Sequence, residues 1–104
     1  MTGIPKRFTR FLEEYPDVGK AYEDLGVAVH TAGPLDAKTR ALVKLSISVG
    51  AGLEGAAHSH IRKAIAVGVT VQEMRHAVLL ALPTIGLPSM MAAMTWIDDI
   101  VETK

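Results

Sequence analysis

The sequence predicts an all-α protein, a compact bundle of about six helices. Hydrophobic residues make up 49% of the 104 residues but aromatic residues only 5%, so the core is expected to be aliphatic and alanine-rich, as in close-packed helices. No segment alternates apolar and polar residues between turns, and there is no Asn-Gly or Asp-Gly hairpin signal. Because 104 residues rarely form two cores, residues 1–104 are predicted to be a single domain.

Proline, glycine and capping residues mark the predicted helix ends. The predicted helices cover about residues 6–14, 17–32, 37–49, 53–67, 71–82 and 89–102. Pro16 suits the start of the second helix, and Gly33 followed by Pro34 ends it. Asp36 is a good N-cap for the third helix, because its carboxylate can accept from the free backbone N–H groups of the first turn.

The later helices have equally clear limits. Gly50 and Gly52 end the third helix, and Gly68 ends the fourth. The segment Thr70-Val-Gln-Glu73 is a capping box, which starts the fifth helix. A break over residues 83–88 separates the fifth helix from the last.

The same break argues against a membrane span. No charged residue occurs from Ala77 to Ile97, which is about the length that crosses a bilayer. Pro83, Gly86 and Pro88 divide this run into two pieces, each too short to span. The first residues show no apolar run of signal-peptide length, so a cytoplasmic location is expected.

Charge and cysteine content exclude several classes of function. Lys plus Arg and Asp plus Glu each total 11, and no basic block occurs, so neither nucleic acid nor a membrane surface is an expected partner. The chain contains no cysteine, which excludes disulfides, thiolate metal ligands and thiol redox chemistry. The apolar content is high for a small domain, which favours association with further copies of the chain.

The segment GLEGAAHSHIRKA, residues 52–64, concentrates candidate functional side chains. On a helix, its apolar residues share one wide face, with His60 near the middle, while Glu54 and His58 lie along one edge. His58 and His60 differ by about 200° in direction, so they cannot bind one metal ion together. A surface pair of Glu54 and His58 is favoured, and a metal site that they form with another element stays open as a less favoured alternative.

His60 has two interpretations. An imidazole on an apolar face buries a donor and an acceptor, which need partners. It is either a core histidine bonded to a backbone carbonyl or polar side chain, or an acid/base group in a small pocket. In the preceding helix Ala41, Lys44 and Ser48 form a small and polar stripe. Lys44 either extends to solvent or is drawn into a pocket, where it would hold an anion.

The other histidines, the methionines and Trp96 are assigned structural positions without a role in function. His30 and His76 are expected at the surface. The methionine-rich last helix, with Trp96, is expected in the core or at a subunit interface; its methionines are Met90, Met91 and Met94.

Four segments occur in a distinctive order. They are LDAKTRALVKLSISV (35–49), GLEGAAHSH (52–60), AIAVGVTVQEM (64–74) and ALPTIGLP (81–88). Together they resemble the carboxymuconolactone decarboxylase family, which includes the alkylhydroperoxidase D type proteins, over about residues 35–102. The resemblance implies a helical bundle that assembles as a homo-oligomer, a trimer or a hexamer.

The redox members of that family have a glutamate, a Cys-x-x-Cys pair and a histidine at set positions. The resemblance places the glutamate at Ala41, the cysteines at Leu53 and Ala56, and the histidine at His60, so only the histidine is present here. Peroxide reduction by that route needs a thiolate and a resolving thiol, so this chain cannot perform it.

The decarboxylase branch offers the better comparison, because its members work without the cysteine pair or a cofactor. The resemblance implies a non-redox enzyme on a small organic acid or lactone, with His60 as general acid/base and Lys44 or Arg40 orienting the carboxylate. Ser48 is included as a substrate-binding residue, Glu54 and His58 as accessory residues, and no metal or cofactor is expected. The alternative is a catalytically silent oligomer that binds small ligands or other proteins.

Overall fold

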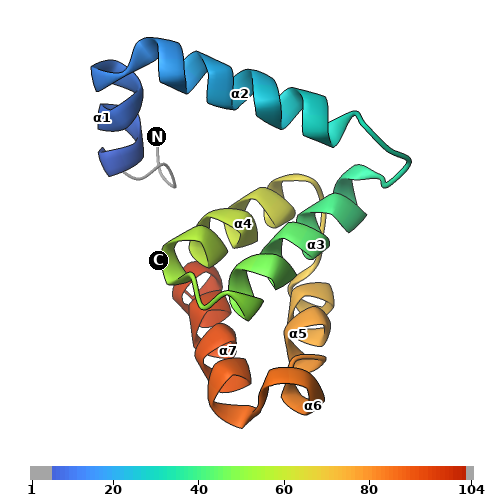
Figure 1. Ribbon diagram of the computed structural model, residues 1–104. Coiled ribbons are helices and arrows are strands. Elements are labelled where there is room, and N and C mark those ends of the chain that lie inside the picture. Colours follow the sequence, from blue (N-terminus) through green and yellow to red (C-terminus); the bar gives the residue numbers. More distant parts are fainter. Residues whose placement is uncertain (1–5, 103–104) are drawn as a thin grey trace. The chain divides into compact units, whose positions relative to one another are not determined.

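The computed structural model describes residues 6–102, and every regular element among them is a helix (Figure 1). The helices are α1 (Lys6–Glu14), α2 (Pro16–His30), α3 (Ala37–Gly50), α4 (Glu54–Ala66), α5 (Val71–Leu79), α6 (Leu82–Ile85) and α7 (Leu87–Val101). This confirms the all-α prediction. The predicted break over residues 83–88 is partly helical, because α6 forms one four-residue turn before Gly86.

The chain divides into two compact units, one ending at Leu35 and the other beginning at Asp36. In the first unit α1 and α2 pack through aromatic side chains, with the ring centroids of Phe8 and Tyr22 6.2 Å apart in an edge-on arrangement. Gly19 lies against Leu12, where a Cβ atom would approach Cδ2 of the leucine to 2.6 Å. The absence of a side chain at Gly19 therefore allows the two helices to meet closely.

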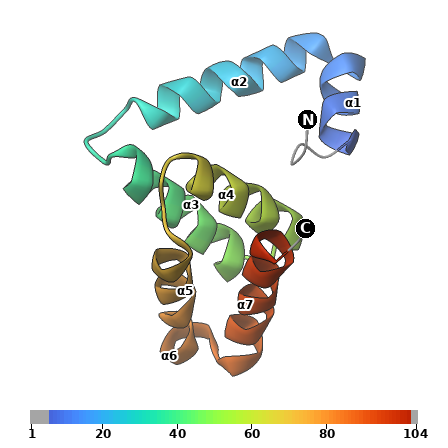
Figure 2. The same cartoon turned by 180° about the vertical axis from the view of Figure 1, so that it is seen from behind.

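The second unit has the main hydrophobic core, which α3, α4, α5 and α7 enclose (Figure 2). Helix α4 packs between α3 and α7, and α5 contacts both α3 and α7. Four large side chains, one from each helix, are almost completely buried: Leu45, Ile61, Met74 and Ile97. This arrangement places α4, with its histidines, between two neighbouring helices.

The predicted caps of the second unit are present. Oδ1 of Asp36 accepts a hydrogen bond from the backbone N–H of Thr39 at 2.8 Å, which starts α3. The side chains of Thr70 and Glu73 accept from each other's backbone N–H at 3.0 and 2.8 Å, a complete capping box for α5. Gly68 adopts φ +92°, a conformation that favours glycine, and so lets the chain leave α4.

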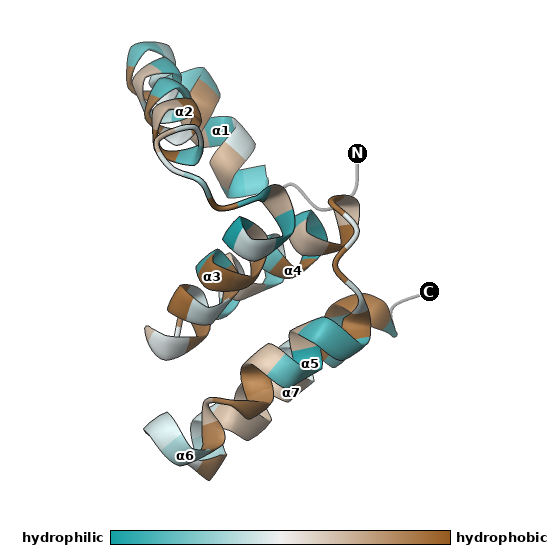
Figure 3. Cartoon of the chain, turned by 90° about the vertical axis from the view of Figure 1, so that its right-hand side faces the viewer, coloured by the Kyte–Doolittle hydropathy of each residue, from teal (hydrophilic) through white to brown (hydrophobic). Residues whose placement is uncertain are grey.

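Large apolar side chains remain on the surface of the second unit. They are concentrated from the end of α5 to the start of α7, where Figure 3 shows brown, hydrophobic segments, and others lie on α3 and at the ends of α4. Ile47 is 64% exposed, Leu80 60% and Met91 54%. Of the methionines predicted in the core or at a subunit interface, Met90 is buried, Met94 packs against the core, and Met91 is exposed in the single chain.

Within residues 6–102, no helix has both the length and the apolar character that a transmembrane span requires.

Candidate functional site

Helix α4 buries a narrower face than its sequence predicts. Ala57, Ile61 and Ala64 are at most 1% exposed and face the core, whereas Leu53 and Val67 are 53% and 42% exposed. Leu53 is the N-cap and Val67 the C-cap, both with non-helical backbone angles, so both lie at the ends of α4 and outside its buried face.

The position of His60 is corrected accordingly. It lies beside the buried face of α4 and is half-buried, whereas its neighbour Ile61 is completely enclosed. Half-burial removes part of the His60 side chain from solvent and leaves the rest accessible. Such a position suits a group that exchanges protons with a bound molecule better than the middle of the core would.

The stripe predicted on α3 is present, with one residue already engaged. Ala41 packs against the core, and Ser48 is only 4% exposed. The Ser48 hydroxyl donates to the backbone carbonyl of Lys44 at 3.0 Å, one turn earlier in the helix. The Ser48 hydroxyl proton is therefore engaged by the helix backbone, at the turn that carries Lys44.

Lys44 is half-buried and lies in a region of positive charge. Burial lowers the pKa of its ammonium group below the ordinary value of 10.5, and the positive charges of Lys63 and Arg40 lower it further. Arg40 precedes Lys44 by one turn of α3, while Lys63 follows His60 by one turn of α4. The α3–α4 pair thus gathers three cations on the helices that carry the predicted site, an arrangement that favours an anion.

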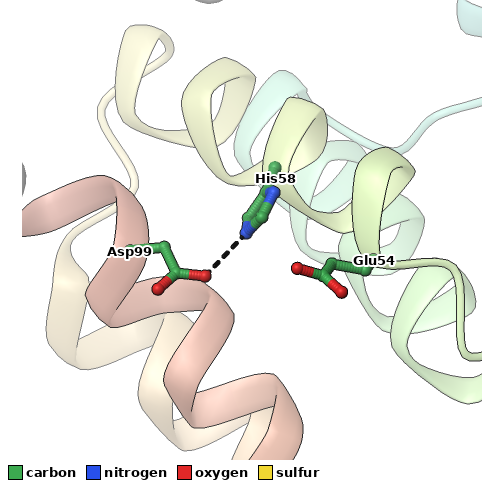
Figure 4. A group of neighbouring side chains, drawn as sticks. All are labelled: Glu54, His58 and Asp99. Carbon is green, nitrogen blue, oxygen red and sulfur yellow. Dashed lines mark hydrogen bonds and ion pairs between the residues drawn. The ribbon is translucent and has the colours of Figure 1, made fainter.

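The other flank of α4 brings together Glu54, His58 and a residue that sequence analysis missed (Figure 4). Nε2 of His58 lies 3.0 Å from Oδ2 of Asp99 on α7. One ligand atom from each of the three residues lies within 4.8 Å of the others, so they could hold a metal ion. The one sequence signal for Asp99 is the Asp98-Asp99 pair in an otherwise uncharged helix. Asp98 itself pairs with Arg75 at 2.9 Å.

A cavity of about 270 Å³ opens between α3, α5 and α6, and its lining includes none of the site residues that the sequence nominated. Its lining is mainly apolar and includes Ser46, Val49, Ala77, Leu80, Thr84 and Ile85. The hydrophobic periodicity of the sequence could not predict this cavity, because it forms where three helices meet.

The two surface histidines complete the comparison with prediction. His76 is exposed, as predicted. His30 is half-buried, so the predicted surface position holds only in part.

Comparison with known proteins extends the resemblance toward the N-terminus. Residues 16–99 match the sequence profile of the carboxymuconolactone decarboxylase family. An uncharacterized protein from Haemophilus influenzae is 34% identical over 61 residues, which cover 59% of this chain and 54% of that protein. The alignment thus spans about half the length of that curated relative, and no solved structure gives a significant match. Because the family profile covers most of the chain, from the start of α2 into α7, the chain belongs to the carboxymuconolactone decarboxylase family.

Proposed function

We propose that the protein is a cofactor-independent, non-redox enzyme that acts on a small carboxylated or lactone-like compound, with His60 as general acid/base. Family membership supports this reaction class. The observation that carries the proposal is the half-buried Lys44, close enough to Lys63 and Arg40 for their charges to lower its pKa. A site built this way attracts a carboxylate, and the lowered hydration of Lys44 strengthens the interaction.

The roles of the residues follow from the chemistry of decarboxylation. When the C–C bond to the carboxylate breaks, carbon dioxide leaves, and the electron pair of that bond remains on the substrate as a dienolate. The carbon that carried the carboxylate then takes a proton. A protonated His60 supplies this proton and later regains one from water. Lys44 or Arg40 holds the carboxylate, and Ser48 acts as a positioning residue through its bond to the Lys44 carbonyl.

Cysteine-dependent peroxide reduction is excluded for this chain. Its positions corresponding to the redox pair are Leu53 and Ala56, and the sequence contains no cysteine. No thiolate is present to attack a peroxide and no second thiol to resolve the product.

A second candidate is a catalytically silent protein that binds small ligands or other proteins. The apolar cavity between α3, α5 and α6 favours it, because about 270 Å³ is sufficient for a small organic molecule and no titratable side chain is among its lining residues. In this case the scaffold persists without chemistry at His60.

Carbon dioxide release and ligand-induced thermal stabilisation distinguish the two candidates. A panel of unsaturated lactones and ring-cleavage carboxylic acids is tested with the wild-type chain, His60→Ala and Lys44→Met. We expect His60→Ala to abolish turnover and keep ligand-induced stabilisation, because binding does not need the proton. For Lys44→Met, we expect that a given thermal stabilisation needs a carboxylate concentration about tenfold higher or more, because a charged hydrogen-bond donor is lost.

Lys38→Met is the matched control, since Lys38 is an exposed lysine of α3 that does not contribute to the shift at Lys44. It should behave as wild type. Stabilisation by panel members without turnover, equal in wild type and Lys44→Met, would favour the silent binding protein. No stabilisation by any member would leave the enzymatic proposal without support.

A further inference from the structure

The proposed reaction does not use the cluster on the other flank of α4. Glu54 is the first residue of α4, His58 follows one turn later, and Asp99 lies near the end of α7. The spacing of four residues puts Glu54 and His58 on the same side of α4. Figure 4 shows the three side chains directed toward one another from the two helices.

We propose that Glu54, His58 and Asp99 bind a divalent transition-metal ion of the zinc type. One imidazole nitrogen and two carboxylate oxygens are ligands that Zn²⁺ accepts, usually together with water. The two carboxylates also concentrate negative charge beside the imidazole, which a dication neutralises. Three protein ligands from two helices would leave one coordination position open to solvent.

The distances fit such an ion after a small adjustment. Metal–ligand distances of about 2.0–2.2 Å in a tetrahedral site place the ligand atoms roughly 3.3–3.6 Å apart. The pair of His58 and Asp99, at 3.0 Å, is already close to this separation, and the others are at most 4.8 Å. A shortening of about 1.3 Å is within the reach of side-chain rotation of Glu54, which is exposed.

Solvent reaches all three side chains, so an ion could enter without opening the core. The Asp99 side chain is 45% exposed and that of His58 21%. The bound ion would replace the His58–Asp99 hydrogen bond, because it takes the same ring nitrogen. It would then join the start of α4 to the end of α7 and stabilise the second unit.

Glu54 separates this proposal from the simpler alternative. An ion pair or hydrogen bond between His58 and Asp99 needs neither a metal nor Glu54, whereas a three-ligand site needs all three residues. Glu54→Gln is therefore the decisive variant. Because Glu54 is exposed, we expect this substitution to leave the fold intact.

The test is calorimetric titration of the chelator-treated full chain with ZnCl₂, followed by Co²⁺ with its visible absorption as a readout of coordination. We expect one ion per chain with micromolar affinity, a rise in the thermal midpoint, and a loss of affinity of about tenfold or more in each of Glu54→Gln, His58→Asn and Asp99→Asn. The control His76→Asn removes an exposed histidine on α5 and should bind as wild type.

Three results would overturn the site: no binding at micromolar zinc, equal binding by wild type and Glu54→Gln, or loss of binding in His76→Asn. The measurement is independent of catalysis, so it stands or falls separately from the role proposed for His60.

Discussion

Lys44 is the residue whose environment departs most clearly from that of an ordinary surface lysine. The sequence left two positions open for this side chain, extended into solvent or enclosed in a pocket. The observed position is intermediate, because Lys44 is half-buried and has two cations, Lys63 and Arg40, near it. Because the charged ammonium is penalised in the folded chain but not in the unfolded one, this side chain reduces stability where it is protonated. Perturbed pKa values of this kind are common among residues at functional sites.

Replacing Lys44 with Met should therefore stabilise the protein at neutral pH. The lowered pKa means that the folded chain binds fewer protons than the unfolded chain between that pKa and the ordinary 10.5. The penalty is then full below the lowered pKa and disappears as the pH rises to about 10.5. We expect a gain in thermal midpoint of about 2–4 °C at neutral pH that vanishes in strongly alkaline buffer, measured by calorimetry.

Lys38→Met, on the same helix but exposed, should show no such gain. A gain for Lys44→Met that persists unchanged through pH 10.5 would contradict a charge-based origin and indicate simple apolar packing.

Helix α3 illustrates how local chemistry positions a candidate site. Its start is set by Asp36, its interior places Leu45 in the core, and Lys44 lies close enough to Lys63 of α4 for that charge to lower its pKa. The hydrogen bond from the backbone N–H of Thr39 is the main cause that lowers the pKa of the Asp36 carboxyl below 3.8. Weakening this cap would loosen the first turn of the helix that carries Arg40 and Lys44.

We expect Asp36→Ala to lower the thermal midpoint by about 4–8 °C at neutral pH, as loss of an N-cap does in a domain of this size. Asp36→Asn keeps an acceptor for Thr39 but not the charge, so it should lose less. Because the carboxyl pKa is lowered, its contribution is present above pH 3.8 and is lost as the pH falls through the lowered value. The difference between wild type and Asp36→Asn should therefore shrink in acid, as followed by circular dichroism melts.

If the loss in thermal midpoint were the same for Asp36→Ala and Asp36→Asn and did not change with pH, the charge of the Asp36 carboxylate would not contribute to the cap.

Many large apolar side chains of this molecule lie on its surface and not in its core. In the first unit, α2 has an exposed stripe at helical spacing, comprising Val18, Tyr22, Leu25 and Val29. In the second unit, Ile47 on α3 and Leu80 after α5 are each at least 60% exposed. Rows of large, exposed apolar side chains are typical of surfaces that other chains cover. We propose that copies of this chain cover them, in a trimer or hexamer.

Light scattering after size exclusion tests this assembly. The wild-type chain should elute with the mass of a trimer or a hexamer at micromolar concentration. Ile47→Glu combined with Leu80→Glu should shift it toward the monomer, because two charges would be buried without partners. Gln72→Glu, an exposed polar position on α5, is the matched control and should not change the mass. A monomeric wild type would contradict the proposal.

The sequence by itself determined the helices, their caps and the family, because those depend on local chemistry: proline and glycine at the ends, a carboxylate before a first turn, and a periodic apolar face. Tertiary structure alone decided how far His60 is buried, which cations surround Lys44, and that Asp99 meets His58 from α7. These features join residues far apart in the chain, up to 41 positions for His58 and Asp99. Helical periodicity specifies the direction of a side chain on its own helix, but the neighbour that it meets depends on how the helices pack.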